Sequence, residues 1–200
     1  MWLNMWQEIE RLIQLSAKPL PDEVDPQRNP ERRNYYRFLY HLVQWRQPKI
    51  ALEIGVEAGF GSRYMARAAA EYGGYVIGID HDARISVPIG DNFEFIQKSS
   101  LSLAAWDMVK AMVGFYGEIG VVYQDSSHHY EASKKEWDLY SQFLDERAIW
   151  ICDDITPAFF DPLIDPPGKG MVQYFDELPG DKRLYPDVLH QGNTWGIVLL

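Results

Sequence analysis

The sequence is poor in the features that mark secreted and membrane proteins. Its one cysteine, Cys152, has no second cysteine with which to form an internal disulfide. No segment approaches the roughly 18 consecutive apolar residues that a membrane span requires. The first segment, MWLNMWQEIERLIQL, carries acids where a secretory leader would be apolar. We therefore expect a cytoplasmic protein that is not associated with a membrane.

Basic residues are also scarce relative to acidic ones. The chain has 19 lysines and arginines and 29 aspartates and glutamates, so its formal net charge is −10. This charge opposes non-specific binding to phosphate backbones, and we do not expect nucleic acid among the partners. The sequence has no repeat or low-complexity tract, and its 46% of hydrophobic residues suffices for one domain with a full core.

Apolar runs predict strands that alternate with helices. Such alternation is typical of an α/β fold with a doubly wound, mostly parallel sheet, in which ligands collect at the carboxyl ends of the strands. We predict a single domain over residues 1–200, with N-terminal helices in 1–47 and a Rossmann-like core in 48–200. The predicted strands are 50–56, 75–80, 93–97, 120–124, 148–154 and 195–200, and the predicted helices are 2–16, 31–46, 62–72, 101–113, 130–143 and 171–178.

A glycine-rich turn follows the first strand. Gly55 and Gly59 lie four residues apart, and position 57 is not a glycine, so the GxGxxG fingerprint of a dinucleotide site is absent. The acids Glu53 and Glu57 would repel a pyrophosphate, but they would tolerate a cationic sulfonium or ammonium group. The turn therefore favours a cofactor other than a dinucleotide.

The helix and strand after this turn complete half of a nucleotide pocket. Ser62 is predicted to start the helix. Asp80 ends the second strand, where its carboxylate can accept both hydroxyl protons of a ribose. An aspartate at this position could instead cap a helix.

Three carboxylates fall at the ends of later strands. Asp125 follows the fourth strand, and Asp153 and Asp154 end the fifth, so all three are expected at one edge of the sheet. Their mutual repulsion is costly unless protons or a cation neutralise it. Oxygen ligands of this kind suit Mg²⁺, although Ca²⁺ or Mn²⁺ would also fit. The alternative is that Asp153 and Asp154 are ordinary turn residues.

Five ordered segments carry a resemblance to known proteins: ALEIGVEAGFGSRYMARA, GIDHD, QKSS, YQDSSHHYE and WICDDI. They resemble the class I S-adenosylmethionine-dependent methyltransferases, and in particular the metal-dependent O-methyltransferases of the catechol O-methyltransferase type. They also resemble the related family that contains the cephalosporin-hydroxylase-type proteins, which shares a D-x-x-H-x-Y element. The resemblance covers about residues 50–155 and implies a Rossmann-like methyltransferase fold with a seven-stranded sheet.

The resemblance also implies roles for individual residues. The glycine turn would hold the methionine end of the cofactor, Asp80 the ribose, and Ser99 or Ser100 the adenine. The two serines could instead cap the helix predicted from residue 101. The implied ligands of S-adenosyl-L-methionine are Glu53, Gly55, Gly59, Ser62, Asp80, Ser99, Ser100 and Asp125. The implied metal ligands are Asp125, Asp153 and Asp154.

Two positions depart from the catechol enzymes. His128 stands where those enzymes place a lysine base, and Asp154 stands where they carry an asparagine. With an unperturbed pKa near ~6.5, a histidine can take a hydroxyl proton at neutral pH. Alternatively, the metal alone promotes loss of the proton and His128 orients the substrate, or His128 is a surface residue. The predicted catalytic residues are therefore His128 and Asp125.

The predicted function is methyl transfer from S-adenosyl-L-methionine to a hydroxyl of a small molecule, such as a catechol, a sugar or a natural product, with a divalent metal. A homodimer is a further expectation from the resemblance. One alternative is a non-catalytic protein of the same fold that binds the cofactor or forms a complex. The other is a Rossmann oxidoreductase that uses a nicotinamide cofactor.

Overall fold

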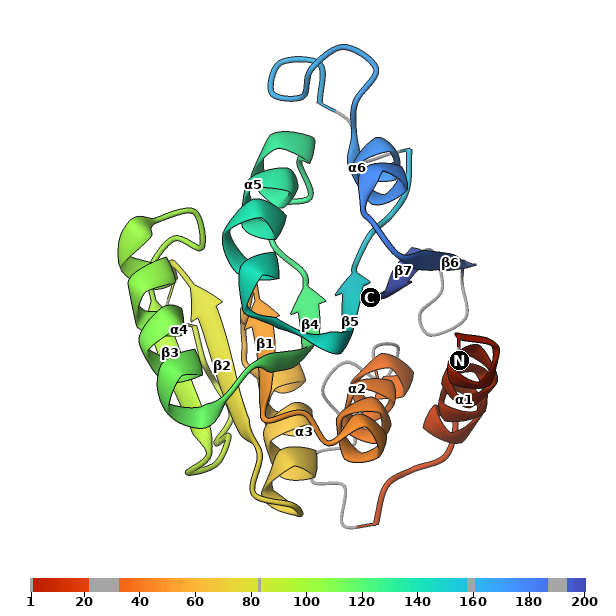
Figure 1. The fold of residues 1–200 in the computed structure, drawn as a ribbon, viewed down its shortest axis with the longest axis vertical. Coiled ribbons are helices and arrows are strands. Elements are labelled where there is room, and N and C mark those ends of the chain that lie inside the picture. Colours follow the sequence, from red (N-terminus) through yellow and green to blue (C-terminus); the bar gives the residue numbers. More distant parts are fainter. Residues whose placement is uncertain (1, 22–32, 83, 158–160, 187–193) are drawn as a thin grey trace.

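A single seven-stranded sheet with helices on both faces forms the molecule (Figure 1). The computed structural model describes residues 2–21, 33–82, 84–157, 161–186 and 194–200. The strands are β1 Ile50–Ile54, β2 Tyr75–Asp80, β3 Phe93–Gln97, β4 Ile119–Gln124, β5 Leu144–Cys152, β6 Asp181–Pro186 and β7 Thr194–Leu199. No helix in these ranges is long and apolar enough to cross a bilayer.

The strand order is β3-β2-β1-β4-β5-β7-β6. The first five strands in this order are mutually parallel, whereas β7 runs antiparallel to both β5 and β6. The order reverses between β1 and β4, which places the ends of these two strands at a topological switch point. The predicted α/β class and the doubly wound, mostly parallel sheet are confirmed.

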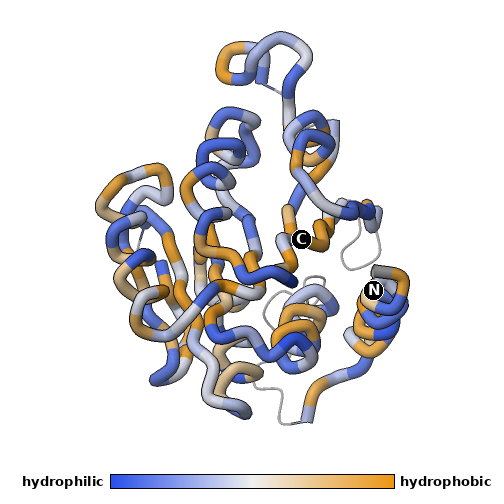
Figure 2. Tube along the Cα trace, viewed as in Figure 1, coloured by the Kyte–Doolittle hydropathy of each residue, from blue (hydrophilic) through white to orange (hydrophobic). Residues whose placement is uncertain are grey.

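The helices are α1 Trp2–Ser16, α2 Arg33–Arg46, α3 Phe60–Ala70, α4 Leu103–Tyr116, α5 Tyr130–Tyr140 and α6 Met171–Glu177. A short 3₁₀ turn, Ser141–Phe143, follows α5. Side chains from α1, α2 and α3 share one buried cluster with the sheet, and those from α4, α5 and α6 share the other. The central strands β1 and β4 are buried along their length and mostly apolar, because both faces of the sheet are covered (Figure 2).

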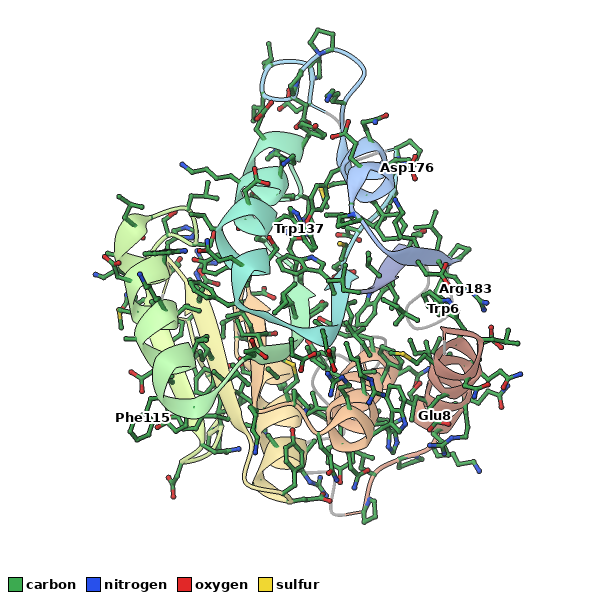
Figure 3. The ribbon with its side chains drawn as sticks, in the orientation of Figure 1. Trp6, Glu8, Phe115, Trp137, Asp176 and Arg183 are labelled. Atoms are coloured by element: carbon green, nitrogen blue, oxygen red, sulfur yellow. The ribbon has the colours of Figure 1, made fainter. Side chains whose placement is uncertain are left out.

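Aromatic residues fix helices to each face of the sheet. On one face, Trp137 of α5 lies with its ring centroid 4.9 Å from that of Trp150 in β5 (Figure 3). On the other, Trp6 of α1 is buried and donates a 2.7 Å hydrogen bond from its indole nitrogen to Asp181. Arg183 covers the Trp6 ring, with its guanidinium carbon 4.6 Å from the ring centroid (Figure 3). The N-terminal helices therefore belong to the core.

Several predicted boundaries move by a few residues. Helix α3 begins at Phe60, so the prediction that Ser62 starts it is wrong; Gly59, in the left-handed region at φ 87°, is the N-cap. Helix α4 begins at Leu103 because Ser102 caps it by accepting a 3.2 Å hydrogen bond from the Ala105 amide. Residues 31–32, where the second helix was predicted to start, lie outside the described residues.

Strand β6 was not among the six predicted strand positions. Its sequence, DKRLYP, lacks an apolar run because the strand lies at the edge of the sheet, where its side chains are exposed or half-buried. It supplies the seventh strand that the family resemblance implied.

Candidate active site

A cavity of about 460 Å³ opens at the carboxyl ends of β1, β2, β4 and β5. Its size is within the usual range for a site that binds a small molecule or cofactor. Most of the predicted site residues line it, namely Gly55, Asp80, Ser99, Ser100, Asp125, His128, Asp153 and Asp154. Glu53, Gly59 and Ser62 are not among its lining residues.

The glycine turn is pressed against the end of β4. A Cβ built on Gly55 would lie 1.9 Å from the carbonyl oxygen of Asp125, and the residue has φ 93°. The Gly55 amide donates a 2.9 Å hydrogen bond to Ile79, and the Asp125 amide donates one of 2.8 Å to Ile54. Only glycine satisfies both the backbone angle and the close approach, so this part of the cavity wall is main chain.

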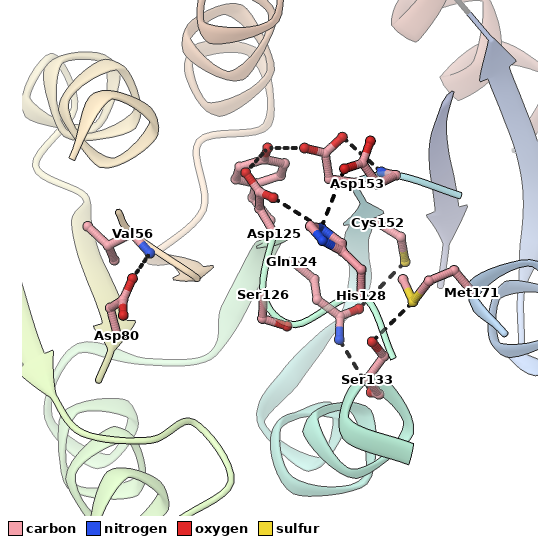
Figure 4. Close-up of polar contacts among 12 residues, drawn as sticks. Val56, Asp80, Gln124, Asp125, Ser126, His128, Ser133, Cys152, Asp153 and Met171 are labelled. Atoms are coloured by element: carbon pink, nitrogen blue, oxygen red, sulfur yellow. Dashed lines mark hydrogen bonds and ion pairs between the residues drawn. The ribbon is translucent and has the colours of Figure 1, made fainter. Parts of the chain in front are cut away.

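Asp80 braces the same turn (Figure 4). Its Oδ2 accepts hydrogen bonds from the amides of Val56, at 3.0 Å, and Glu57, at 2.9 Å. Its Oδ1 accepts one from the Asp82 amide at 3.0 Å. These amides belong to turns and not to a helix, so Asp80 is not the helix cap of the alternative interpretation. Because Oδ2 is fully used, Oδ1 is the oxygen with capacity left for a ligand hydroxyl.

Glu53 lies behind the cavity wall, with 2% of its surface exposed. Its carboxyl group accepts a hydrogen bond from the Ser62 hydroxyl, in the first turn of α3. Burial raises the pKa of Glu53 to about 8. Glu53 and Ser62 therefore join β1 to α3 behind the turn, and the predicted contacts of Glu53, Gly59 and Ser62 with a cofactor stay predictions.

The predicted carboxylate cluster is present at the ends of β4 and β5 (Figure 4). The Tyr123 hydroxyl lies 2.9 Å from Asp125 Oδ2 and 3.0 Å from Asp153 Oδ2. One hydroxyl proton cannot serve both oxygens at once, so the two carboxylates share this donor. Asp153 is 4% exposed and also accepts a 2.9 Å hydrogen bond from the Asp154 amide.

His128 points into this cluster from a left-handed backbone turn with φ 53°. Its Nε2 lies 3.2 Å from Asp125 Oδ1 and 3.9 Å from Asp154 Oδ2. Burial lowers the pKa of His128, but the hydrogen bond to Asp125 and the charges of the three aspartates together raise it above its ordinary value. The aspartates thus favour the protonated form of the imidazole, which cannot accept a proton.

The group of residues whose ligand atoms lie close enough to hold a metal differs by one residue from the predicted metal ligands. Ligand atoms of Asp125, His128 and Asp153 all lie within 4.8 Å of one another. His128 takes the place predicted for Asp154, whose backbone is itself left-handed at φ 54°. Two carboxylate oxygens and one imidazole nitrogen form a donor set that fits a divalent cation.

Glu136 is a cavity residue that the sequence interpretation did not identify. It lies on α5, is 1% exposed, and accepts hydrogen bonds from Ser100 Oγ, Gln124 Nε2 and Ser126 Oγ. Burial raises its pKa, although these three hydrogen bonds oppose the shift. In the polar segment SKKEWDLY a glutamate is typical of a solvated helix face. The available signal was its spacing of four residues from the aromatic residue Tyr140, which is buried.

The two serines after β3 have different environments. The Ser99 hydroxyl accepts a hydrogen bond of 3.3 Å from the Leu101 amide, whereas Ser100 donates its hydroxyl proton to Glu136 at 2.5 Å. Neither caps α4, because Ser102 does so. Both line the cavity, as predicted for residues near an adenine.

The loop before α6 is anchored to the start of α5. Asp165 is buried, and its carboxylate accepts 2.8 Å hydrogen bonds from the amides of Tyr130 and Asp161. His129 Nδ1 lies 3.4 Å from the same carboxylate, so His129 binds the loop and does not face the metal-binding residues. Residues 158–160, which precede Asp161, lie outside the described residues.

Comparisons with known proteins agree with this geometry. A model of the methyltransferase domain family matches residues 52–155, just over half of the chain. No protein of curated function matched the sequence. The structure is similar to an O-methyltransferase from Bacillus cereus in complex with SAH, with 16% identity, a TM-score of 0.62, and coverage of 96% of this chain and 90% of the other.

Two further solved structures are similar over nearly the whole chain. One is the SAM-bound O-methyltransferase of tomaymycin synthesis from Streptomyces achromogenes, with 15% identity, a TM-score of 0.61, and coverage of 96% and 88%. The other is an SAH-bound methyltransferase from Podospora anserina, with 14% identity, a TM-score of 0.60, and coverage of 96% and 87%. At these identities the likeness establishes the fold, and the predicted Rossmann-like methyltransferase fold is confirmed.

Proposed function

Because the chain belongs to the methyltransferase domain family, we propose that it transfers a methyl group from S-adenosyl-L-methionine to a hydroxyl oxygen of a small molecule. A divalent cation at Asp125, His128 and Asp153 would bind that hydroxyl. The observation that carries the proposal is the cavity itself, because the glycine turn at Gly55 and the possible metal ligands Asp125, His128 and Asp153 line the same cavity. Solved structures of the same fold contain SAM or SAH.

The cofactor half of the proposal places the methionine end against the main chain at Gly55, where no side chain intervenes. The ribose would be bound by Asp80 through Oδ1, because Oδ2 already accepts the amides of Val56 and Glu57. Glu53 holds α3 to β1 and keeps the turn in position. The charge that faces the sulfonium group in this arrangement comes from Asp125.

The metal half of the proposal gives His128 the role of a ligand in place of the predicted base. The aspartates around it raise its pKa, which favours a proton on the imidazole when no cation is bound. A cation bound there would replace that proton and lower the pKa of a coordinated substrate hydroxyl. Because one donor is an imidazole nitrogen, the site should favour a transition ion such as Mn²⁺ over the predicted Mg²⁺.

The acceptor class is part of the proposal. A hydroxyl beside a second oxygen, as in a catechol, a sugar or a polyketide, can approach a metal and a sulfonium in the same cavity. The net charge of −10 disfavours polyanionic acceptors, including nucleic acid. Homodimer formation and a cytoplasmic location stay predictions from the sequence.

Calorimetric titration with S-adenosylhomocysteine and with NAD tests the cofactor assignment. We expect S-adenosylhomocysteine to bind and NAD not to bind; binding of NAD alone would contradict the proposal and favour an oxidoreductase. Methyl transfer to a panel of catechols, sugars and polyketides, with and without chelator, then tests the reaction. Cofactor binding without turnover on any acceptor would favour a non-catalytic protein of this fold.

Metal binding is tested separately by titrating Mn²⁺ and Mg²⁺ into the chelator-treated protein. Replacing one ligand, in Asp153→Asn, should weaken Mn²⁺ binding at least about tenfold. The matched control is Asp176→Asn on the exposed face of α6 (Figure 3), which should bind Mn²⁺ as the wild type does. Equal affinity of the two variants would exclude Asp153 as a ligand.

A further inference from the structure

Glu136 occupies an unusual position for a carboxylate. It is almost completely buried on α5, yet it lines the cavity beside Ser100 and Ser126. Its side chain reaches the strand-end loops after β3 and β4, which are separated in the sheet by β2 and β1. The carboxylate thus lies where the walls formed by these two loops meet.

The hydrogen bonds to Glu136 leave one acceptor position. Its Oε2 accepts from Gln124 Nε2 and Ser126 Oγ, both at 2.7 Å, which uses both lone pairs of that oxygen. Its Oε1 accepts from Ser100 Oγ at 2.5 Å. Among the described residues no further donor to Oε1 is present, so one lone pair of a buried carboxylate oxygen is available at the cavity wall.

The surroundings of this oxygen suit a flat heterocycle. Ile79 and Leu101 are apolar members of the same cavity lining, and Asp80, which follows Ile79, is the proposed ribose ligand. A planar base between apolar side chains would turn its polar edge toward Ser100 and Glu136. The exocyclic amino group of adenine is a donor, whereas hypoxanthine carries a carbonyl acceptor at the same ring position.

We propose that Glu136 is the residue that distinguishes the base of the bound cofactor, by accepting a hydrogen bond at Oε1 from the exocyclic amino group of adenine. The inference rests on the proposed function, since it requires that an adenosyl cofactor occupy the cavity. It assigns base recognition to a carboxylate on α5, where the sequence resemblance pointed to Ser99 or Ser100. Ser100 then positions this carboxylate.

A purely structural role for Glu136 would be to tie the loops of Ser100 and Ser126 to α5. Such a role affects all ligands of the cavity alike, whereas base recognition changes the preference between two bases. The test therefore compares S-adenosylhomocysteine with S-inosylhomocysteine, which differ at the 6-position and in the proton on the adjacent ring nitrogen. Calorimetry gives both dissociation constants for the wild type, for Glu136→Gln, and for Glu131→Gln, an exposed glutamate on the same helix.

The wild type should bind S-adenosylhomocysteine at least about tenfold more tightly than S-inosylhomocysteine, because hypoxanthine would place its carbonyl against the Glu136 carboxylate. Glu136→Gln should lose or reverse this preference, since an amide N–H can face that carbonyl, and Glu131→Gln should retain it. Equal binding of the two compounds by the wild type would overturn the inference and leave the proposed function intact. That outcome overturns the inference even if Glu136→Gln does not fold, and a folded Glu136→Gln that keeps the wild-type preference overturns it as well. If the wild type binds neither compound, the proposed function is contradicted and the inference falls with it.

Discussion

The buried carboxyl group of Glu53 should make the stability of the protein depend on pH. Burial raises its pKa from the ordinary value of 4.5 to about 8 in the folded protein. Between these two values the folded chain holds a proton that the unfolded chain has released. Stability from this group is therefore fully present below about pH 4.5 and is lost as the pH rises through about 8.

The size of the effect follows from the shift. Each pKa unit corresponds to about 1.4 kcal/mol, so a shift of roughly 3.5 units corresponds to a loss of about 5 kcal/mol between pH 4.5 and 8. In Glu53→Gln the group is neutral at every pH, and this loss disappears. Relative to the wild type, the variant should therefore gain stability steadily over that range.

Urea unfolding of both proteins at intervals from pH 5 to pH 9 measures this difference. Glu94→Gln, at an exposed position on β3, is the control and should follow the wild-type curve at all pH values. If the free energies of unfolding of the wild type and Glu53→Gln ran parallel from pH 5 to 9, the reasoning about Glu53 would be refuted.

Three further substitutions test other parts of the site. Gly55→Ala should destabilise the protein by more than about 2 kcal/mol in urea unfolding and abolish S-adenosylhomocysteine binding. The alanine Cβ would collide with the Asp125 carbonyl, and the backbone at this position has a left-handed φ. A variant as stable as the wild type would contradict this prediction. Tyr123→Phe removes the donor shared by Asp125 and Asp153 and should cost about 1–3 kcal/mol of stability; an unchanged unfolding midpoint would show that the hydroxyl is not needed. Asp165→Ala should speed limited proteolysis of the loop before α6 and cost about 1 kcal/mol, and an unchanged cleavage rate would refute its anchoring role.

The positions of the strand-end residues could be predicted because a parallel sheet brings these ends to one edge. Asp80, Asp125 and Asp153 lie at the carboxyl ends of different strands, and the sheet places them around one cavity. The relationship to methyltransferases, suggested by the ordered segments around these residues, was confirmed by the family match over residues 52–155.

The directions of individual side chains could not be predicted in the same way. The motif position of Glu53 suggested a ligand contact, but its carboxyl group reaches Ser62 behind the turn. His128, and not Asp154, groups with Asp125 and Asp153, and both residues adopt a left-handed backbone, at φ 53° and 54°, which a pattern of residue types does not encode. Glu136 was missed because tertiary packing buries a helix face whose local sequence is polar.

The most direct test of the central claim is a crystal structure of the protein with S-adenosylhomocysteine and Mn²⁺, with anomalous diffraction measured for the manganese. We predict one anomalous peak bound by Asp125, His128 and Asp153, and a cofactor whose methionine end lies against Gly55 and whose ribose contacts Asp80. A nucleotide bound elsewhere, or no manganese among these three side chains at saturating concentration, would contradict the account of this cavity as a metal-dependent methyl-transfer site.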